Sequence, residues 1–223
     1  KRRRHRRVVA GAAALIVLIL GGGYGIMFHL LPQMKYNDAQ TALTNGEYTA
    51  AAEKFAEISS YKDAADMVEE SNYRHAVALL DSDYVTAEDI AQARTLLDTL
   101  TDQTRTDDLR KSADYQEGLL LLNDGKLDDA EKLFTALGDY ENSRTQLQEI
   151  AYRRLSAEME TASDYDAIRE GLNALNGYQD SAALIEKTWY LEAKSLLEGD
   201  NPDPVSAIAC LEEIPDYEGA AEL

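Results

Sequence analysis

The chain has 223 residues, of which 41 are acidic and 22 are Lys or Arg, and its formal net charge at pH 7 is −19. The first 35 residues contain seven Lys or Arg and no acid, so all the acidic residues lie in the rest of the chain. Such an acidic body excludes nucleic-acid binding, which needs clustered Lys and Arg, and favours basic partners. The single cysteine, Cys210, excludes an intramolecular disulfide, and we expect it to be buried on an apolar helix face.

An uncharged segment of 24 residues, Val8 to Leu31, follows a basic flank at residues 1–7, with His29 taken as neutral. At about 1.5 Å per residue, a helix of this length crosses the roughly 30 Å hydrocarbon core of a bilayer. It is too long for the apolar region of a signal peptide, so we expect an uncleaved transmembrane anchor helix over 8–31. The positive-inside rule then places the N-terminus in the cytoplasm and the acidic body outside the cytoplasm, as a single-pass protein of the cell membrane.

Glycines near the end of this anchor allow two interpretations. Gly21 and Gly25 form a small-xxx-small pair, which can hold two transmembrane helices together. Glycine is also common in membrane helices that do not dimerise, so the oligomeric state stays open. We expect Pro32 to end or kink the helix and residues 32–35 to form a linker.

A tyrosine-marked motif recurs about every 38 to 39 residues along the remaining chain. Its four copies are Tyr61-Lys62-Asp63-Ala64, Tyr140-Glu141-Asn142-Ser143, Tyr178-Gln179-Asp180-Ser181 and Tyr217-Glu218-Gly219-Ala220. A fixed period of this size predicts stacked helical hairpins, so we expect an all-α fold with an α-solenoid over residues 36–223. The Asp, Asn or Ser of each motif is expected to cap the following long helix, as Asp63 would cap a helix that runs toward Leu80.

A small residue and a large apolar residue stand four apart in each predicted short helix. The pairs are Ala51 and Phe55, Ala93 and Leu97, Ala130 and Phe134, Ile168 and Leu172, and Ala207 and Leu211. A small side chain lets neighbouring helices approach, and the large one fills the groove between them. We therefore take the large members Phe55, Leu97, Phe134, Leu172 and Leu211, together with the motif tyrosines Tyr61, Tyr140, Tyr178 and Tyr217, as the structural repeat positions.

The other tyrosines also follow the period. One set lies within the long helices (Tyr36, Tyr73, Tyr115, Tyr152 and Tyr190), and a further set follows the turn between helices (Tyr48, Tyr84 and Tyr165). Tyrosines that recur at repeat positions are packing residues first, so we expect all of them to pack. The second unit departs from the pattern because Thr101-Asp102-Gln103-Thr104 replaces the tyrosine motif, and there we expect a longer polar loop, either a tolerated insertion or a contact site.

The segments Gly46-Glu47-Tyr48…Ala51…Phe55 and Gly125-Lys126-Leu127…Ala130…Phe134, with the tyrosine links, carry a family resemblance. The chain resembles the tetratricopeptide (TPR) and Sel1-like repeat families, most closely the divergent TPR-like repeats of bacterial membrane-anchored proteins. The period is longer than the standard one, and the Trp-Leu-Gly and terminal Pro signals of that family are missing. The resemblance implies protein–protein interaction and supplies no catalytic residues. The chain begins with Lys rather than Met, and its end, residues 219–223, matches the start of another repeat helix, so we expect a truncated last repeat and a natural protein that continues in both directions.

No residue pattern indicates a reaction or a bound cofactor. His75 has no second ligand at metal spacing, and the many carboxylate pairs are what a chain with 41 acids would contain by composition. We therefore predict no catalytic, cofactor-binding or metal-binding residues and no enzymatic activity. The leading hypothesis is a membrane-anchored extracytoplasmic scaffold for a protein or peptide partner, with a basic one favoured. The alternative is the sensor ectodomain of a signalling protein whose cytoplasmic module, a kinase or zinc ribbon, precedes residue 1.

Overall fold

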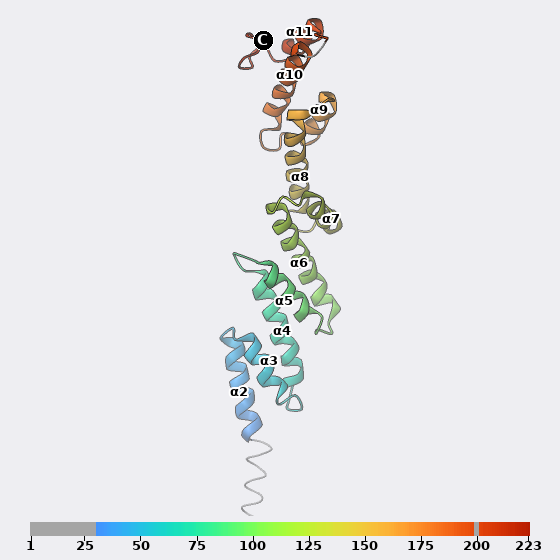
Figure 1. Ribbon diagram of the computed structural model, residues 1–223. Helices are drawn as coiled ribbons and strands as arrows, with labels where there is room; N and C mark the ends of the chain where they lie inside the picture. Colours follow the sequence, from blue (N-terminus) through green and yellow to red (C-terminus); the bar gives the residue numbers. More distant parts are fainter. Residues whose placement is uncertain (1–29, 199–200) are drawn as a thin grey trace, which may run out of the picture. The chain divides into compact units, whose positions relative to one another are not determined.

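A computed structural model describes residues 30–198 and 201–223 of the chain. Within these ranges it contains ten α-helices, one short 3₁₀ helix and no strand, which confirms the all-α prediction (Figure 1). The predicted anchor over 8–31, including Gly21 and Gly25, lies outside the described residues apart from Leu30 and Leu31. In the part of the chain that is described, no helix has the length and apolar character needed to cross a membrane.

The chain divides into two compact units, Lys1–Gln116 and Glu117–Leu223. In the first unit, helices that are consecutive in sequence pack against each other, so that α3 contacts both α2 and α4, and α4 contacts α5. Their bounds are α2 (Leu31–Thr44), α3 (Tyr48–Ala56), α4 (Ala64–Leu80) and α5 (Ala87–Leu97). The next helix, α6 (Gln103–Asn123), contains the boundary between the units.

The second unit has the same sequential pattern of packing, with α8 against α7 and α9, and α10 against α9 and α11. Its helices are α7 (Leu127–Leu137), α8 (Ser143–Glu158), η2 (Met159–Thr161), α9 (Tyr165–Ala174), α10 (Ser181–Glu198) and α11 (Pro204–Glu212). Asp203 caps α11, because its carboxylate accepts a hydrogen bond from the Ser206 N–H at 3.1 Å, and Pro204 follows as the first helical residue.

Large apolar residues of the short helices form the centres of the core. Phe55, Leu97 and Phe134 are 0% exposed and Leu172 is 1% exposed. Their partners four residues earlier (Ala51, Ala93, Ala130 and Ile168) are buried as well. Leu211 differs, since it is only half-buried against a cluster of Ala193, Ala207 and Cys210. The expectation that Cys210 is buried is confirmed.

The start of α2 differs from the sequence prediction. Residues 32–35, which we expected to form a linker, lie in the first turns of α2. Pro32 stands in the first turn of this helix as its bounds are described. The expected end or kink of the anchor helix at Pro32 depends on residues before Leu30, which lie outside the described part of the chain.

Candidate functional site

Each tyrosine motif forms the same hydrogen-bonded turn before the helix or turn that follows it. The fourth residue donates its N–H to the tyrosine carbonyl, at 3.1 Å for Ala64, Ser143 and Ser181 and at 3.0 Å for Ala220. This fourth residue is small because it is buried, with Ala64 and Ser143 at 0% exposure and Ser181 at 1%. The recurring sequence is therefore the sequence of a recurring turn whose last residue is buried.

The second residue of the motif has a left-handed backbone in three of the four copies. The φ angle is 51° at Lys62, 48° at Glu141 and 50° at Gln179. Residues other than glycine rarely adopt such angles. In the last copy the positive φ is at Gly219, one position later.

In three of the four turns, the motif tyrosine packs against a tyrosine of the preceding long helix. Tyr36 and Tyr61 are edge to face at 6.0 Å between ring centroids, and Tyr152 and Tyr178 are edge to face at 6.2 Å. Tyr190 and Tyr217 lie 5.3 Å apart. These distances are in the favourable range for aromatic pairs, and the motif tyrosines Tyr61, Tyr140, Tyr178 and Tyr217 are all half-buried.

The capping role predicted for the third motif residue is wrong at Asp63. Asp63 stands at the N-cap position of α4, but its side chain makes no cap hydrogen bond. Its Oδ1 instead accepts a hydrogen bond from the Tyr36 hydroxyl at 2.6 Å, and Asp180 accepts one from Tyr152 in the same way. These hydrogen bonds raise the pKa of Tyr36 and of Tyr152 above the ordinary value, with burial adding to the effect. Asn142 also makes no cap hydrogen bond.

The second repeat, for which we predicted a longer polar loop at residues 101–104, has its extra residues elsewhere. From Leu100 to the buried Thr106 there are six positions, as from Ile58 to Ala64, so 101–104 contain no insertion. Gln103 takes the place of the motif tyrosine, and Arg105 lies over the Tyr73 ring at 3.9 Å. A cation–π contact therefore replaces the aromatic pair.

Two carboxylates of α4 bind the segment that contains Arg105. The Arg105 guanidinium binds Glu70 at 2.9 Å, and Arg74 binds the same carboxylate at 2.7 Å. Thr101 donates its hydroxyl to Glu69 at 2.9 Å. Burial raises the pKa of Glu70, but the hydrogen bonds from Arg74 and Arg105 outweigh it, so the pKa lies below the ordinary value.

Tyr84 lies in the loop between α4 and α5 and is 88% exposed, so the prediction that it packs is wrong. The extra residues lie here, because α5 is longer than α3 at its N-terminal end. A capping box of Thr86 and Asp89 begins α5. Ile90 stands seven residues before Leu97, as Tyr48 stands seven before Phe55, and Ile90 is 3% exposed. Ile90 therefore occupies the buried position that we assigned to Tyr84.

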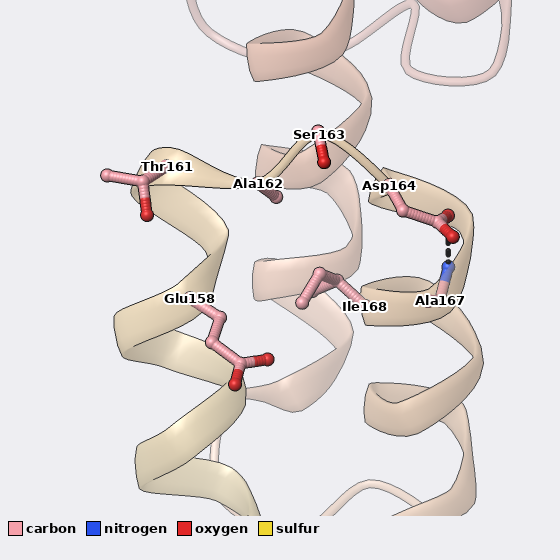
Figure 2. Close-up of a pocket in the computed structure, with 7 residues that line it drawn as sticks. All are labelled: Glu158, Thr161, Ala162, Ser163, Asp164, Ala167 and Ile168. Atoms are coloured by element: carbon pink, nitrogen blue, oxygen red, sulfur yellow. Dashed lines mark hydrogen bonds between the residues drawn. The ribbon is translucent and has the colours of Figure 1, made fainter.

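A depression of about 300 Å³ lies at the turn from α8 into α9, and Figure 2 shows its lining residues. Glu158, Thr161 and Ser163 supply polar groups, and Ile168 is a buried apolar neighbour. Asp164 is occupied in capping α9, since its carboxylate accepts the Ala167 N–H at 3.0 Å. The lining contains no His, Cys or Lys, so this surface offers hydrogen bonds and one free carboxylate rather than a nucleophile beside a base.

A second depression, of about 320 Å³, lies at the turn from α6 into α7. Lys126, Asp128, Asp129 and Arg154 contribute both signs of charge to its lining. Asp128 is paired with Arg154 at 2.5 Å. The depression is therefore lined by charges of which at least two are already paired with each other.

Charged side chains also join successive helices in the second unit. Arg154 of α8 binds Glu131 of α7 at 2.7 Å, and Arg169 of α9 binds Glu192 of α10 at 2.8 Å. The Arg169 side chain is only 7% exposed and lies 3.4 Å over the Trp189 ring. Cys210 is close to this pair, and burial, then the Glu192 carboxylate, raises the pKa of its thiol. A protonated buried thiol is a poor nucleophile.

Among the described residues, no group of three His, Cys, Asp or Glu side chains could hold a metal ion. His75 is half-buried, and its ring stacks on Tyr48 at 5.8 Å. Burial lowers the pKa of His75, so its neutral form is favoured.

Comparison with known proteins assigns neither a family nor a function to the chain. No family model, no curated protein and no solved structure matches the chain. The resemblance to TPR and Sel1-like repeats stays a prediction from sequence. What is established of the fold is that the described residues form helices joined by turns and loops, with no strand.

Proposed function

We propose that this chain is a single-pass membrane protein whose TPR-like helical-repeat domain, an α-solenoid over residues 36–223, lies outside the cytoplasm and binds another protein. The observation that carries the proposal is the recurring turn with its tyrosine pair, found at Tyr36 and Tyr61 and again at Tyr152 and Tyr178. Repeats of this kind stack helical hairpins and leave extended surfaces for partners.

The distribution of charge supports a basic protein or peptide as the partner. The 41 acidic residues all follow the first 35 positions, and many lie at exposed sites such as Asp81, Asp83 and Glu88. A field of one sign speeds encounter with oppositely charged surfaces and repels nucleic acid. The two open depressions, lined by polar and charged groups, suit such contacts better than they suit a reaction, and we assign no enzymatic activity.

Membrane attachment rests on the sequence of the first 31 residues. Six of the seven residues before Val8 are Lys or Arg, and the 24 residues that follow carry no formal charge. This arrangement favours a cytoplasmic N-terminus and an anchor that is kept in the mature protein.

Labelling of intact cells with a membrane-impermeant maleimide tests this placement. The reporter is Ser82→Cys in a Cys210→Ala background, because Ser82 is exposed and the native thiol is buried. We expect the reporter to react without lysis. The matched control is His5→Cys in the same background, which should react only after lysis. Reaction of both cysteines only after lysis would contradict the proposal.

A further inference from the structure

The loop between α4 and α5 presents the one exposed tyrosine of the described residues. Tyr84 is 88% exposed, whereas every other tyrosine in residues 30–198 and 201–223 is buried or half-buried. Helices of the first unit flank this loop on both sides. Tyrosine is enriched among the residues that dominate the binding energy of protein interfaces. The packing of the described residues therefore leaves one aromatic ring unused, at the position where the second repeat has its extra residues.

Exposed carboxylates surround this tyrosine in the sequence. Asp81, Asp83 and Glu88 are all exposed, and the chain has no Lys or Arg anywhere in residues 75–93. A fourth acid, Asp89, is occupied in capping α5, because it accepts the Thr86 N–H at 2.9 Å. The segment therefore collects negative charge and supplies no cation of its own.

The position of Asp81 is unfavourable for the helix that it ends. Asp81 is the C-cap residue of α4, and the last turn of α4 contains no basic residue. The helix dipole places partial negative charge at this end, so a carboxylate there destabilises the helix and a cation stabilises it. Glu88 differs, since it lies in the first turn of α5, where an acid is favourable. Asp81 and the nearby Asp83 therefore favour a cation that comes from outside the loop.

Elsewhere in this chain, an arginine lies over an aromatic ring and is bound by a carboxylate at the same time. Arg105 lies 3.9 Å over the Tyr73 ring and binds Glu70 at 2.9 Å. In the second unit, Arg169 lies 3.4 Å over the Trp189 ring and binds a carboxylate of α10 at 2.8 Å. The loop between α4 and α5 contains the ring and the carboxylates of this arrangement but no arginine.

We propose that Tyr84, together with Asp81 and Asp83, binds an arginine side chain of the partner protein. The inference rests on the proposed function and names the group of the basic partner that this loop recognises. A planar guanidinium can stack on the ring while its N–H groups donate to carboxylates, which the compact ammonium group of lysine does less well. A second copy of this chain is a poor occupant, because all 41 of its acids follow position 35 and two such bodies repel each other.

Two short fluorescein-labelled peptides of equal charge provide the test, one in which Gly alternates with Arg and one in which Gly alternates with Lys. Each is titrated with the full-length protein in detergent micelles at physiological ionic strength, and binding is followed by fluorescence anisotropy. We expect the Arg peptide to bind the wild type about threefold more tightly than the Lys peptide. Tyr84→Ala should remove this preference, and Tyr84→Phe, which keeps the ring, should retain it.

A matched pair of double variants separates this site from the acidic surface as a whole. Asp81→Asn with Asp83→Asn should weaken binding of the Arg peptide about tenfold, because the guanidinium loses its acceptors. Glu212→Gln with Glu213→Gln removes the same charge from exposed positions of the second unit and should weaken binding less than about twofold. All four positions are exposed, so the variants should fold, and circular dichroism checks this.

An unchanged preference for the Arg peptide in Tyr84→Ala, equal effects of the two double variants, or no binding of the Arg peptide would overturn the proposal. Self-association of the wild-type chain that Tyr84→Ala abolishes would also overturn it, in favour of a second copy. None of these results bears on the labelling experiment at Ser82, so failure of this inference and failure of the proposed function remain distinguishable.

Discussion

The Tyr36 hydroxyl donates a hydrogen bond to Asp63 Oδ1 at 2.6 Å, across 27 residues of sequence and from one helix to the turn before another. The same contact joins Tyr152 to Asp180. In these two turns the aspartate binds the preceding long helix, so its recurrence in the motif reflects a tertiary contact rather than a helix cap.

Removing the Tyr36 hydroxyl tests this contact. Tyr36→Phe keeps the ring that packs on Phe55 and Tyr61 but leaves Asp63 without its donor. We expect a loss of about 1–2 kcal/mol in the free energy of unfolding, measured by urea denaturation. Tyr84→Phe is the matched control and should change nothing, because Tyr84 is 88% exposed. Equal effects of the two substitutions would contradict the assignment.

The raised pKa of Tyr36 gives a dependence on pH. The protonated hydroxyl is the donor, so the folded state holds this proton more tightly than the unfolded chain, whose tyrosine has the ordinary pKa of 10.0. The contribution to stability is therefore complete below about pH 10 and is lost as the pH rises through the folded-state pKa. Unfolding free energies measured from pH 8 to 11 should fall more steeply in the wild type than in Tyr36→Phe. Parallel curves would show that Tyr36 has no special proton affinity.

Phe134 is the largest buried side chain of α7, at 0% exposure. Phe134→Ala should cost about 3–5 kcal/mol in the free energy of unfolding, because a cavity replaces the ring. Phe134→Leu, which keeps most of the volume, should cost clearly less. A loss below about 1 kcal/mol for the alanine variant would mean that the ring is not part of the core.

Gly118 of α6 lies directly against this ring, within the second unit. A Cβ atom at Gly118 would come within 2.8 Å of two ring atoms of Phe134, closer than side-chain contacts allow. Gly118→Ala should therefore destabilise the protein by about 1–3 kcal/mol although alanine favours helices. The combination with Phe134→Leu should cost less than the sum of the two single variants, as thermal denaturation can measure. Strict additivity would place the two residues apart.

The ion pair of buried Arg169 with half-buried Glu192 predicts the result of exchanging their charges. Arg169→Glu places two carboxylates together at a site where the side chain is 7% exposed, and should cost about 3–5 kcal/mol in unfolding free energy. Arg169→Glu with Glu192→Arg restores opposite charges and should recover a large part of the loss. Failure of the double variant to recover would show that the position does not select its partner by charge.

Much of the core was predictable because burial follows the period. The small–large pairs identified Phe55, Leu97, Phe134 and Leu172 without any structure, since only buried positions require both size and spacing to recur. The role of Asp63 was not predictable in this way. An aspartate before a helix is equally typical of a cap, and the Tyr36 hydroxyl that binds it instead is distant in sequence.

The error at Tyr84 had a signal in the sequence. Tyr48 and Tyr165 stand three residues before the small member of their pairs, whereas Tyr84 stands nine before Ala93. That difference places Ile90 at the buried position and leaves Tyr84 in the inserted loop. The charged contacts of Arg154 and Arg169 had no comparable signal, because in a chain this rich in charge the pairing depends on which helix faces turn toward each other.

Photo-crosslinking in intact cells tests the central claim, that the chain binds another protein, most directly. A photoreactive phenylalanine analogue replaces one exposed residue at a time, Tyr84, Glu158 or Ile208, with buried Phe134 as the matched control position. The account predicts a discrete adduct with one other protein from at least one exposed position, lost when an excess of unlabelled chain competes, and none from Phe134. No adduct from any exposed position, or the same adducts from Phe134, would contradict it.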